Sequence, residues 1–363
     1  MTETACDEFG PCRVIQLYSP KEALRAFVVV DNTALGPAVG GVRMSPTVSL
    51  DEVRRLARTM TLKNAAAGLP HGGAKAGIVA SPAAPDKERI FRVFARMIRD
   101  IVDYIPGPDM GCDETAMAWI RDETGRSVGL PEEIGGLPLD RLGATGFGIA
   151  ECAEVAAGFA GFDLAGARVA IEGFGSVGKA TARFLAGKGA VLVAVSDSRG
   201  GVYHPAGLDH AALSEVKRLG RSVADCGKGE VLPRDGIFAV PCDILVPAAT
   251  PDVIHAGNVG KIQARLVLEG ANIPATPEAE RELQARGTLV LPDFIANAGG
   301  VIMAAMEYAG RSEQDAFTAI SERIRRNTRL TLERAAADKI LPRAAADLLA
   351  RERVRQAMSY RDY

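Results

Sequence analysis

The spacing of hydrophobic residues predicts a mixture of strands and helices in the first part of the chain. Residues 26–30 form a short apolar run, which is typical of a buried strand. A helix is predicted from Ser49 to about Ala67, because Ser49 and Glu52 have the spacing of a capping box. Residues 86–104 repeat apolar side chains at helical spacing, which predicts an amphipathic helix. A loop at 106–111 and a short helix near 113–124 complete this part.

After a loop-like segment at 130–145, the pattern changes to strands that alternate with helices. This alternation favours a parallel, doubly wound sheet. The predicted strands are 168–172, 191–197, 243–246, 266–268 and 288–291, and the predicted helices are 145–160 and 177–188. The stretch 214–236 is interpreted as a helix and then a loop, and long helices return from about Ser312.

The chain has 363 residues, more than one hydrophobic core usually serves. We therefore expect an α/β protein of two domains separated by a cleft. The first, at 1–142, is an α/β domain for substrate binding and oligomerisation. The second, at 143–327, is a Rossmann-type, doubly wound dinucleotide-binding domain. The C-terminal helices at 328–363 are expected to pack back on the first domain.

Charge and cysteine content exclude several classes of protein. The formal net charge is -2, from 43 basic and 45 acidic residues, which gives no basic surface for nucleic acid. The six cysteines are scattered and form no C-x-x-C pair, so neither a zinc site nor a disulfide framework is expected. With no signal-like N-terminus and no long apolar run, we expect a cytoplasmic protein without a metal or a membrane partner.

The most specific motif is a glycine-rich turn within residues 168–178, RVAIEGFGSVG. An apolar strand precedes it and a helix follows, so that its three glycines permit a sharp turn, a close approach of a pyrophosphate and tight packing of helix on strand. Free N–H groups at the start of this helix attract phosphate. The cofactor-binding positions predicted here are Gly173, Gly175, Ser176, Val177 and Gly178.

The strand that follows this helix ends at Asp197, a carboxylate that can accept hydrogen bonds from ribose hydroxyls. Asp197 favours NAD, because it repels the 2′-phosphate of NADP. Arg199 could instead bind that phosphate. We expect NAD, with NADP as the alternative.

Lys63 stands out because it continues the apolar stripe of Val53, Leu56 and Met60 on its predicted helix. Lysine is rarely buried without a reason, although a side chain at the end of a helix can also extend to solvent. Lys75 lies among small residues in GLPHGGAKAG, where it is either a solvated loop lysine or a base in an enclosed site.

Asp109 lies in the segment PGPDMG, between two predicted helices. Aspartate is a common turn residue, but a carboxylate on a rigid loop is also suited to moving protons.

Together these segments resemble the glutamate/leucine/phenylalanine/valine dehydrogenase family, from about Val29 to Tyr308. The resemblance rests on LGPAVGGVRM (35–44), MTLKNAAAGLPHGGAKAGI (60–78), GPDMG (107–111), GATGFG (143–148), EGFGSVGKATARFL (172–185), EGAN (269–272) and PDFIANAGGVI (292–302). It implies reversible oxidative deamination of an L-amino acid to a 2-oxo acid and ammonia. It also implies small-molecule partners and assembly into hexamers or octamers.

The resemblance also implies roles for individual residues. Lys75 is the catalytic lysine, which acts on water, and Asp109 is the catalytic aspartate, which moves protons to and from nitrogen. Lys63 binds the substrate α-carboxylate. The remaining implied positions are Gly40 and Gly41 close to the substrate, Asn272 and Asn297 near the amino group and the nicotinamide, and Thr145 near the nicotinamide amide.

Two further positions bear on the substrate. Family members that use glutamate have a lysine where this chain has Val39 and a serine where it has Ala304. A buried carboxylate without these partners loses about 3–5 kcal/mol. We therefore expect an apolar amino acid of the leucine, valine or phenylalanine type.

Other features and other functions stay open at this point. Residues 194–209 look more like the glutamate enzymes, and His71 and Ala76 replace common family residues. The alternatives are a glutamate dehydrogenase, a 2-hydroxy acid dehydrogenase and a non-catalytic nucleotide-binding regulator. The second usually needs a histidine and acid pair, which the sequence does not suggest, and the third leaves Lys63, Lys75 and Asp109 without a role.

Overall fold

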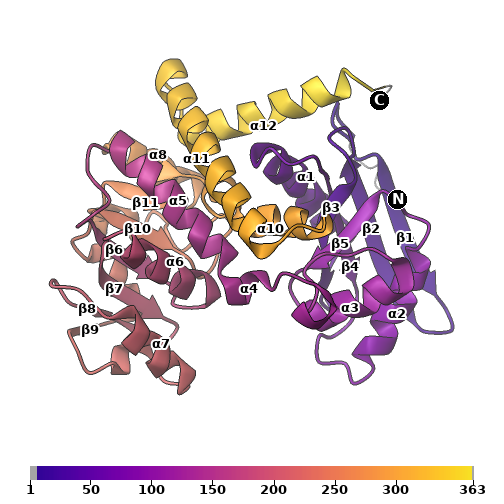
Figure 1. Cartoon of the computed structure of the whole chain (residues 1–363), viewed down its shortest axis with the longest axis horizontal. Coiled ribbons are helices and arrows are strands. Elements are labelled where there is room, and N and C mark those ends of the chain that lie inside the picture. Colours follow the sequence, from indigo (N-terminus) through magenta and orange to yellow (C-terminus); the bar gives the residue numbers. More distant parts are fainter. Residues whose placement is uncertain (1–5, 362–363) are drawn as a thin grey trace. The chain divides into compact units, whose positions relative to one another are not determined.

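The computed structural model describes residues 6–361, which divide into two compact units (Figure 1). The first unit comprises Met1–Leu139, Val301–Ala316 and Asp347–Tyr363. The second comprises Asp140–Gly300 and Phe317–Ala346. Each unit has its own sheet, so the expected α/β class is present in both parts of the chain.

A five-stranded mixed sheet forms the centre of the first unit, in the order β1-β2-β4-β3-β5. Strand β4 pairs antiparallel with β2 and parallel with β3, and β3 pairs parallel with β5 at the edge. The strands are β1 Arg13–Ser19, β2 Leu24–Asn32, β3 Ala38–Met44, β4 Gly72–Ile78 and β5 Tyr104–Pro108. All seven residues of β4 are buried, because it is a central strand covered on both faces.

Helix α1, Leu50–Ala66, packs against β4 through small side chains. Ser49 caps it by accepting a hydrogen bond from the Glu52 amide, which is one half of the predicted capping box, while the Glu52 carboxylate accepts a hydrogen bond from Arg43. The expected stripe of Val53, Leu56, Met60 and Lys63 is wrong beyond its first member. The helix buries Val53, Ala57, Thr61 and Asn64 instead, because only small side chains fit against the glycines of β4.

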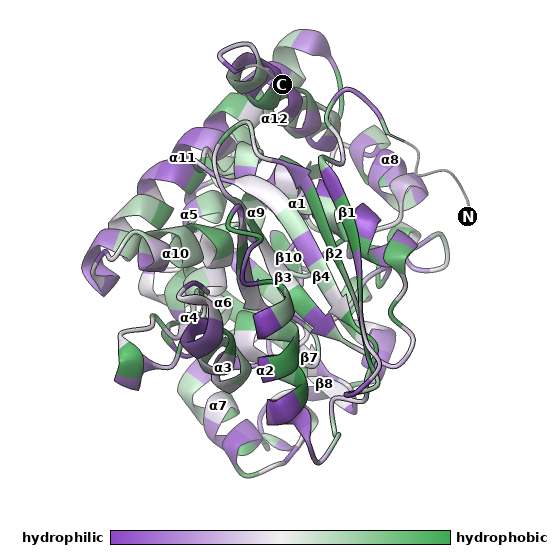
Figure 2. Cartoon of the chain, turned by 90° about the vertical axis from the view of Figure 1, so that its right-hand side faces the viewer, coloured by the Kyte–Doolittle hydropathy of each residue, from purple (hydrophilic) through white to green (hydrophobic). Residues whose placement is uncertain are grey.

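Two predictions around residue 100 are wrong in detail. Helix α2, Lys87–Met97, ends well before Tyr104, and residues 104–108 form strand β5 rather than a loop. Prolines are tolerated in β5 because it is an edge strand, where one side of the backbone needs no partner. The hydrophilic and hydrophobic faces of α2 can be followed in Figure 2. The other helices of this part are α3 Glu114–Thr124 and the short α4 Leu139–Leu142.

The second unit has a seven-stranded sheet in the order β12-β11-β10-β6-β7-β8-β9. The first five of these strands are parallel, as predicted. Strands β8 and β9 add an antiparallel edge that was not predicted, and β9 lies in the stretch 214–236 that was interpreted as a helix and then a loop. The strands are β6 Arg168–Glu172, β7 Val191–Asp197, β8 Gly200–Tyr203, β9 Glu230–Leu232, β10 Ile244–Pro247, β11 Leu266–Leu268 and β12 Leu289–Leu291.

The order of the second sheet determines where a ligand is expected. From β6 the chain passes through α6 to β7 on one side, and it later returns to β10 on the other side. Ligands of such sheets bind at the carboxyl ends of the strands where this reversal occurs. The helices of this part are α5 Ala144–Phe159, α6 Ser176–Gly187, α7 His210–Arg218, α8 Pro277–Ala285 and α9 Asp293–Ala296.

The C-terminal helices divide between the units differently from the expected boundaries. These helices are α10 Gly299–Tyr308, α11 Glu313–Asp338 and α12 Pro342–Met358. Val301–Ala316 joins the first unit, where Glu307 accepts hydrogen bonds from the amides of Leu130 and Leu137. Phe317–Ala346 joins the second unit, where Ser321 donates a hydrogen bond to Glu151. Of the segment 328–363, which was expected to pack on the first unit as a whole, only Asp347–Tyr363 belongs with it.

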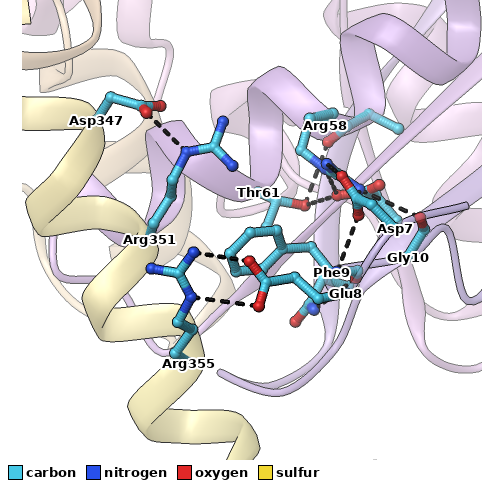
Figure 3. Close-up of polar contacts among 12 residues, drawn as sticks. Asp7, Glu8, Phe9, Gly10, Arg58, Thr61, Asp347, Arg351 and Arg355 are labelled. Atoms are coloured by element: carbon cyan, nitrogen blue, oxygen red, sulfur yellow. Dashed lines mark hydrogen bonds and ion pairs between the residues drawn. The ribbon is translucent and has the colours of Figure 1, made fainter. Parts of the chain in front are cut away.

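The segment around Phe9 is anchored in the first unit by charged side chains (Figure 3). Phe9 is 1% exposed, and the guanidinium groups of Arg58, Arg351 and Arg355 lie 5.5, 5.4 and 5.2 Å from its ring centroid. Its neighbours Asp7 and Glu8 pair with Arg58 and Arg355 at 2.6 and 2.7 Å. This early segment therefore ties α1 to α12, a structural role that the sequence did not indicate.

Replacing Phe9 by alanine removes the apolar centre of this cluster, and we expect the loss to cost about 3 kcal/mol of stability. The measurement is the thermal and urea unfolding of F9A. The matched control is Y18A, because Tyr18 on β1 is 64% exposed and its removal is expected to change stability by less than about 0.5 kcal/mol. Equal stability of the two variants would contradict the anchoring role.

Candidate functional site

Lys75 and Asp109 form an ion pair in the first unit. Lys75 lies in the middle of β4, and Asp109 follows the last residue of β5. Their Nζ and Oδ2 atoms are 3.1 Å apart, and the Lys75 side chain is 7% exposed. The hypothesis of an ordinary solvated loop lysine is therefore wrong. This central strand was not predicted, because the segment GGAKAG consists of residues with a low propensity for β-structure.

Burial changes the acid–base properties of this pair. Removal from water lowers the pKa of Lys75 below 10.5, because the charged form loses hydration, while the nearby Asp109 carboxylate partly opposes that change. Burial raises the pKa of Asp109, but the cations of Lys75 and Arg43 outweigh it, so that the pKa is below 3.8. The pair thus combines an amine that loses its proton more readily than usual with a carboxylate that stays ionised.

Arg43 belongs to this site, although sequence reasoning did not identify it. Its Nε atom donates to Asp109 Oδ2 at 2.8 Å, and its Nη1 atom donates to Glu52 Oε1 at 2.6 Å. Val39, Gly41 and Arg43 alternate along β3, which places them on one face of the strand. This alternation within the motif LGPAVGGVRM was the available signal.

Gly41 leaves the space that the Lys75 amine occupies. A Cβ atom at Gly41 would lie 3.1 Å from Lys75 Nζ and 2.8 Å from Asp109 Cβ. At Gly40 a Cβ atom would lie 1.6 Å from the carbonyl oxygen of Ala74 on β4. The two glycines are therefore required for the close packing of β3 against the strand and the side chain that carry the ion pair.

Lys63 lies in the last turn of α1 and is half-buried. Helix α1 packs on β4, the strand that carries Lys75. Thr61, which precedes Lys63 by two residues, lies against Gly73 of the same strand. The structure thus places both lysines on neighbouring elements of the first unit.

Val39 and Ala304 belong to one small hydrophobic cluster, which is completed by Ile105 and Val128. Val39 is 7% exposed and Ala304 is 8% exposed. The two positions that were predicted to face the substrate side chain therefore lie together in an apolar environment, contributed by β3, β5 and α10.

His71 is a buried packing residue in this structure. Its Nδ1 atom lies 3.1 Å from the carbonyl oxygen of Pro37, and its ring contacts that of Tyr308 edge to face at 5.8 Å. Burial lowers the pKa of His71, so the neutral ring is favoured. These contacts give the residue that departs from the family pattern at position 71 a packing role.

The glycine turn of the second unit fits a dinucleotide pyrophosphate. Gly173 follows β6 with φ +92°, and a Cβ atom there would lie 2.7 Å from Ala249. A Cβ atom at Gly178 would lie 1.9 Å from the Gly173 carbonyl oxygen, whereas Gly175 faces open space. No side chain caps the N-terminus of α6, so that the amides near Ser176 and Val177 can bind phosphate oxygens.

Asp197 ends β7 as predicted, but its carboxylate already accepts four hydrogen bonds. The side chains of Lys217 and Ser222 donate to it at 2.8 Å, and the amides of Arg199 and Val223 donate at 2.9 and 3.0 Å. These bonds lower the pKa of Asp197 to about 2, against the effect of burial. The Arg199 guanidinium donates to the Gly220 carbonyl oxygen at 2.9 Å.

Asn272 and Asn297 come together in the second unit. The Asn297 amide nitrogen lies 3.2 Å from Asn272 Oδ1 and 3.3 Å from the Gly270 carbonyl oxygen. Thr145, in the first turn of α5, belongs to the same unit. The predicted site residues therefore form groups within each unit: the ion pair and the apolar cluster in the first, and the glycine turn, the Asp197 cluster and the asparagine pair in the second.

No group of three or more His, Cys, Asp or Glu side chains among residues 6–361 is arranged to hold a metal ion. Within the same residues, no helix has the length and hydrophobicity needed to cross a bilayer.

Known families and solved structures match nearly the whole chain. Residues 13–126 match the model described as Glu/Leu/Phe/Val dehydrogenase, dimerisation domain, and residues 135–362 match Glutamate/Leucine/Phenylalanine/Valine dehydrogenase. The chain is 40% identical to a glutamate dehydrogenase of Aeropyrum pernix, over 92% of this chain and 85% of that protein. It is 38% identical to an NADP-specific glutamate dehydrogenase of Saccharolobus shibatae, over 91% and 83%.

Two solved structures extend the comparison to the fold. The hetero-hexameric glutamate dehydrogenase of Thermus thermophilus in its leucine-bound form has a TM-score of 0.85 and 33% identity, over 97% of this chain and 90% of that chain. The L-tryptophan dehydrogenase of Nostoc punctiforme has a TM-score of 0.77 and 27% identity, over 97% and 98%. The expected family, fold class and NAD(P) dependence are thereby confirmed, and the chain belongs to the Glu/Leu/Phe/Val dehydrogenase family of amino acid dehydrogenases.

Proposed function

We propose that this protein catalyses the reversible, NAD(P)-dependent oxidative deamination of an L-amino acid to a 2-oxo acid and ammonia. The observation that carries the proposal is the buried contact of 3.1 Å between Lys75 Nζ and Asp109 Oδ2. A lysine with a lowered pKa can take a proton from water at moderate pH, and a neighbouring carboxylate can relay protons to and from nitrogen.

In the proposed mechanism, each site residue of the first unit has a separate chemical role. Neutral Lys75 removes a proton from the water that attacks the imine carbon of the oxidised substrate. Asp109 accepts and returns protons at the substrate nitrogen, and Arg43 keeps it ionised and oriented through the bond to Oδ2. Lys63 binds the α-carboxylate. Because these steps need a nearly dry environment, the low exposure of Lys75 supports the assignment.

The second unit binds the coenzyme in this proposal. Bound NAD(P) supplies the acceptor for the hydride that leaves the substrate Cα atom. The glycine turn and the N-terminus of α6 hold the pyrophosphate, and Thr145, Asn272 and Asn297 line the nicotinamide end. The ion pair with Lys217 compensates the charge of Asp197, so we propose that NADP is accepted beside NAD.

L-Glutamate is the substrate best supported by the relatives, because the two curated proteins described above are named glutamate dehydrogenases. The expectation of an apolar substrate is not supported by those names. Use of glutamate requires groups other than Val39 and Ala304 to bind the side-chain carboxylate, since neither residue can pair with it.

An apolar or aromatic L-amino acid is the second candidate. The specific observation that favours it is the buried cluster of Val39, Ile105, Val128 and Ala304. The similarity to a tryptophan dehydrogenase is compatible with a substrate of this kind. We further propose that copies of this chain assemble, which the match to a dimerisation domain and the similarity to a hexameric enzyme support. The cytoplasmic location stays a prediction.

Replacing Lys75 by methionine is expected to lower kcat about 1,000-fold, because the proton acceptor for water is lost. The matched control is K21M, because Lys21 is an exposed residue of the same unit. Both variants are assayed for kcat after their thermal unfolding has been compared with that of the wild type. Wild-type kcat in K75M would contradict the assignment.

The pH profile tests the pair independently. In the wild type, kcat/KM for deamination is expected to rise with pH, with a midpoint below 10.5, as Lys75 loses its proton. In D109N the midpoint of the residual activity should move to lower pH, because the carboxylate that stabilises the ammonium is gone. A midpoint that stays in place or rises in D109N would show that another group controls the rate.

A panel of single L-amino acids with NAD and with NADP identifies the substrate. If glutamate gives the highest kcat/KM, the apolar candidate fails. If leucine, valine, phenylalanine or tryptophan does, V39K/A304S is expected to raise the ratio of glutamate to leucine activity at least tenfold, a difference of about 1.4 kcal/mol. An unchanged ratio would show that Val39 and Ala304 do not contact the side chain of the substrate. If no amino acid reduced either coenzyme, the proposed enzymatic activity would be contradicted.

Removing the Lys217 ammonium is expected to shift the coenzyme preference toward NAD. In K217M the Asp197 charge is no longer paired, so that kcat/KM for NADP should fall about tenfold relative to NAD. The control is R281M, because Arg281 is an exposed residue of α8 that pairs with its helical neighbour Glu278 at 2.8 Å. A constant NADP to NAD ratio in K217M would contradict the role of charge compensation.

A further inference from the structure

Arg343, in the first turn of α12, gathers three carboxylates of the second unit. Its Nε atom lies 2.6 Å from Glu280 Oε1, its Nη1 atom lies 3.1 Å from Asp293 Oδ1, and its Nη2 atom lies 2.5 Å from Glu269 Oε2. The side chains of Glu269, Glu280 and Asp293 are 0%, 6% and 8% exposed. One guanidinium therefore joins three successive segments, near residues 269, 280 and 293, which lie 50 to 74 residues before it in the sequence.

The charges in this cluster do not balance if all three acids are ionised. Burial raises the pKa of Glu269 well above 4.5, and Glu280 and Asp293 raise it further against the opposing effect of Arg343. Oε1 of Glu269 is buried and has no hydrogen-bond partner among residues 6–361. The raised pKa favours the protonated form of Glu269, which reduces the excess negative charge around Arg343.

The same carboxylates cross-link two loops. Glu269 Oε2 accepts a hydrogen bond from the Asp293 amide at 2.9 Å, and Asp293 Oδ2 accepts one from the Ile273 amide at 3.1 Å. Ile273 has φ +48°, which is strained for a β-branched residue. Such backbone persists only where surrounding contacts hold it, and Arg343 holds Asp293 in position to do so.

The two loops carry Asn272 and Asn297. Asn272 immediately precedes the strained Ile273, and Asn297 follows α9, which begins at Asp293. The Asn297 amide nitrogen contacts Asn272 Oδ1 at 3.2 Å and the carbonyl oxygens of Gly270 and Ala271 at 3.3 and 3.4 Å. Every bond of this set depends on the relative position of residues 269–273 and 293–297.

We propose that Arg343 is a positioning residue for Asn272 and Asn297, which it fixes by holding Glu269 and Asp293 together. The proposal rests on the proposed function, because the two asparagines matter for the reaction only if they contact the substrate and the nicotinamide. Arg343 itself touches neither reactant. Its guanidinium fork is essential because Nε, Nη1 and Nη2 are held apart in one plane and each binds a different carboxylate, whereas the three donors of an ammonium lie on a single atom and cannot span the same separation.

The test compares R343K with the wild type and with R286K in the full-length protein. R343K keeps a cation beside the acids but loses the fork. Arg286 is a matched control, because its guanidinium also joins loops of the second unit, through the Val259 and Ile262 carbonyl oxygens at 2.8 Å. The readouts are amide hydrogen exchange of peptides covering 269–275 and 293–298, kcat, KM for the amino acid, and thermal unfolding.

In R343K we expect exchange in both peptides to rise at least tenfold, kcat to fall about tenfold and KM for the amino acid to rise. R286K should leave exchange in these peptides, kcat and KM unchanged. Exchange at the wild-type level in R343K would overturn the proposal. Faster exchange with unchanged kcat and KM would overturn it as well, since Arg343 would then be merely structural.

A second variant covers the possibility that the arginine acts only by neutralising charge. In R343M/E280Q one cation and one anion are removed together, so that folding is expected to be retained while exchange stays fast and kcat stays low. Wild-type exchange and kcat in this variant would overturn positioning by the fork. A wild-type enzyme that is silent with all amino acids would contradict the proposed function, whereas the exchange comparison would still decide whether Arg343 fixes the two loops.

Discussion

The removal of one lysine from water is the constraint on which the first unit depends. Lys75 lies on a central strand, where its amine has lost most of its hydration and has Asp109 as its ion-pair partner. A buried ammonium without a partner would be strongly destabilising, and a fully paired one would hold its proton too tightly to act as a base. Arg43 donates a hydrogen bond to the same oxygen of Asp109 that pairs with Lys75. The negative charge of Asp109 is therefore shared between two cations, and it stabilises the Lys75 ammonium less than it would alone.

Small residues make this burial possible. The close approach of β3, β4 and α1 requires glycine at positions 40, 41 and 73, where a Cβ atom would collide with a backbone or side-chain neighbour. The second unit follows the same principle at its glycine turn, where Gly173 and Gly178 permit close packing and Gly175 leaves room for a ligand. In both units the glycines act by leaving space rather than by being flexible. Gly41 leaves space for the Lys75 amine, and Gly175 leaves space for a phosphate.

The sequence predicted the second unit better than the first. The five parallel strands have strong apolar runs separated by helices, and this pattern is local. By contrast, β4 is built from glycine, alanine and Lys75, and β5 contains two prolines, so that neither has the composition of a strand. Both become strands through pairing with β3, which is a tertiary effect. The buried face of α1 was assigned incorrectly for the same reason, because Ala57 and Thr61 are chosen by the shape of the sheet.

Motifs pointed to the residues of the proposed site, but the surroundings of these residues depended on three-dimensional contacts. Arg43 and Arg343 were not identified, since their partners lie 66 and 50 to 74 residues away. The sequence also did not predict that Lys217, Ser222 and two backbone amides donate hydrogen bonds to the Asp197 carboxylate, although these bonds bear directly on the choice of coenzyme. A motif specifies which residue is present. The pKa of that residue, and the number of hydrogen bonds that it can still form with a ligand, are set by neighbours from distant segments.

The central claim is that the Lys75 amine titrates below its ordinary range, and an NMR titration of that amine tests it most directly. In protein labelled with ¹⁵N-lysine, the Nζ resonance that is absent from K75R is followed against pH. A midpoint below 10.5 is the result that this account predicts. A Lys75 midpoint at or above 10.5 would contradict it.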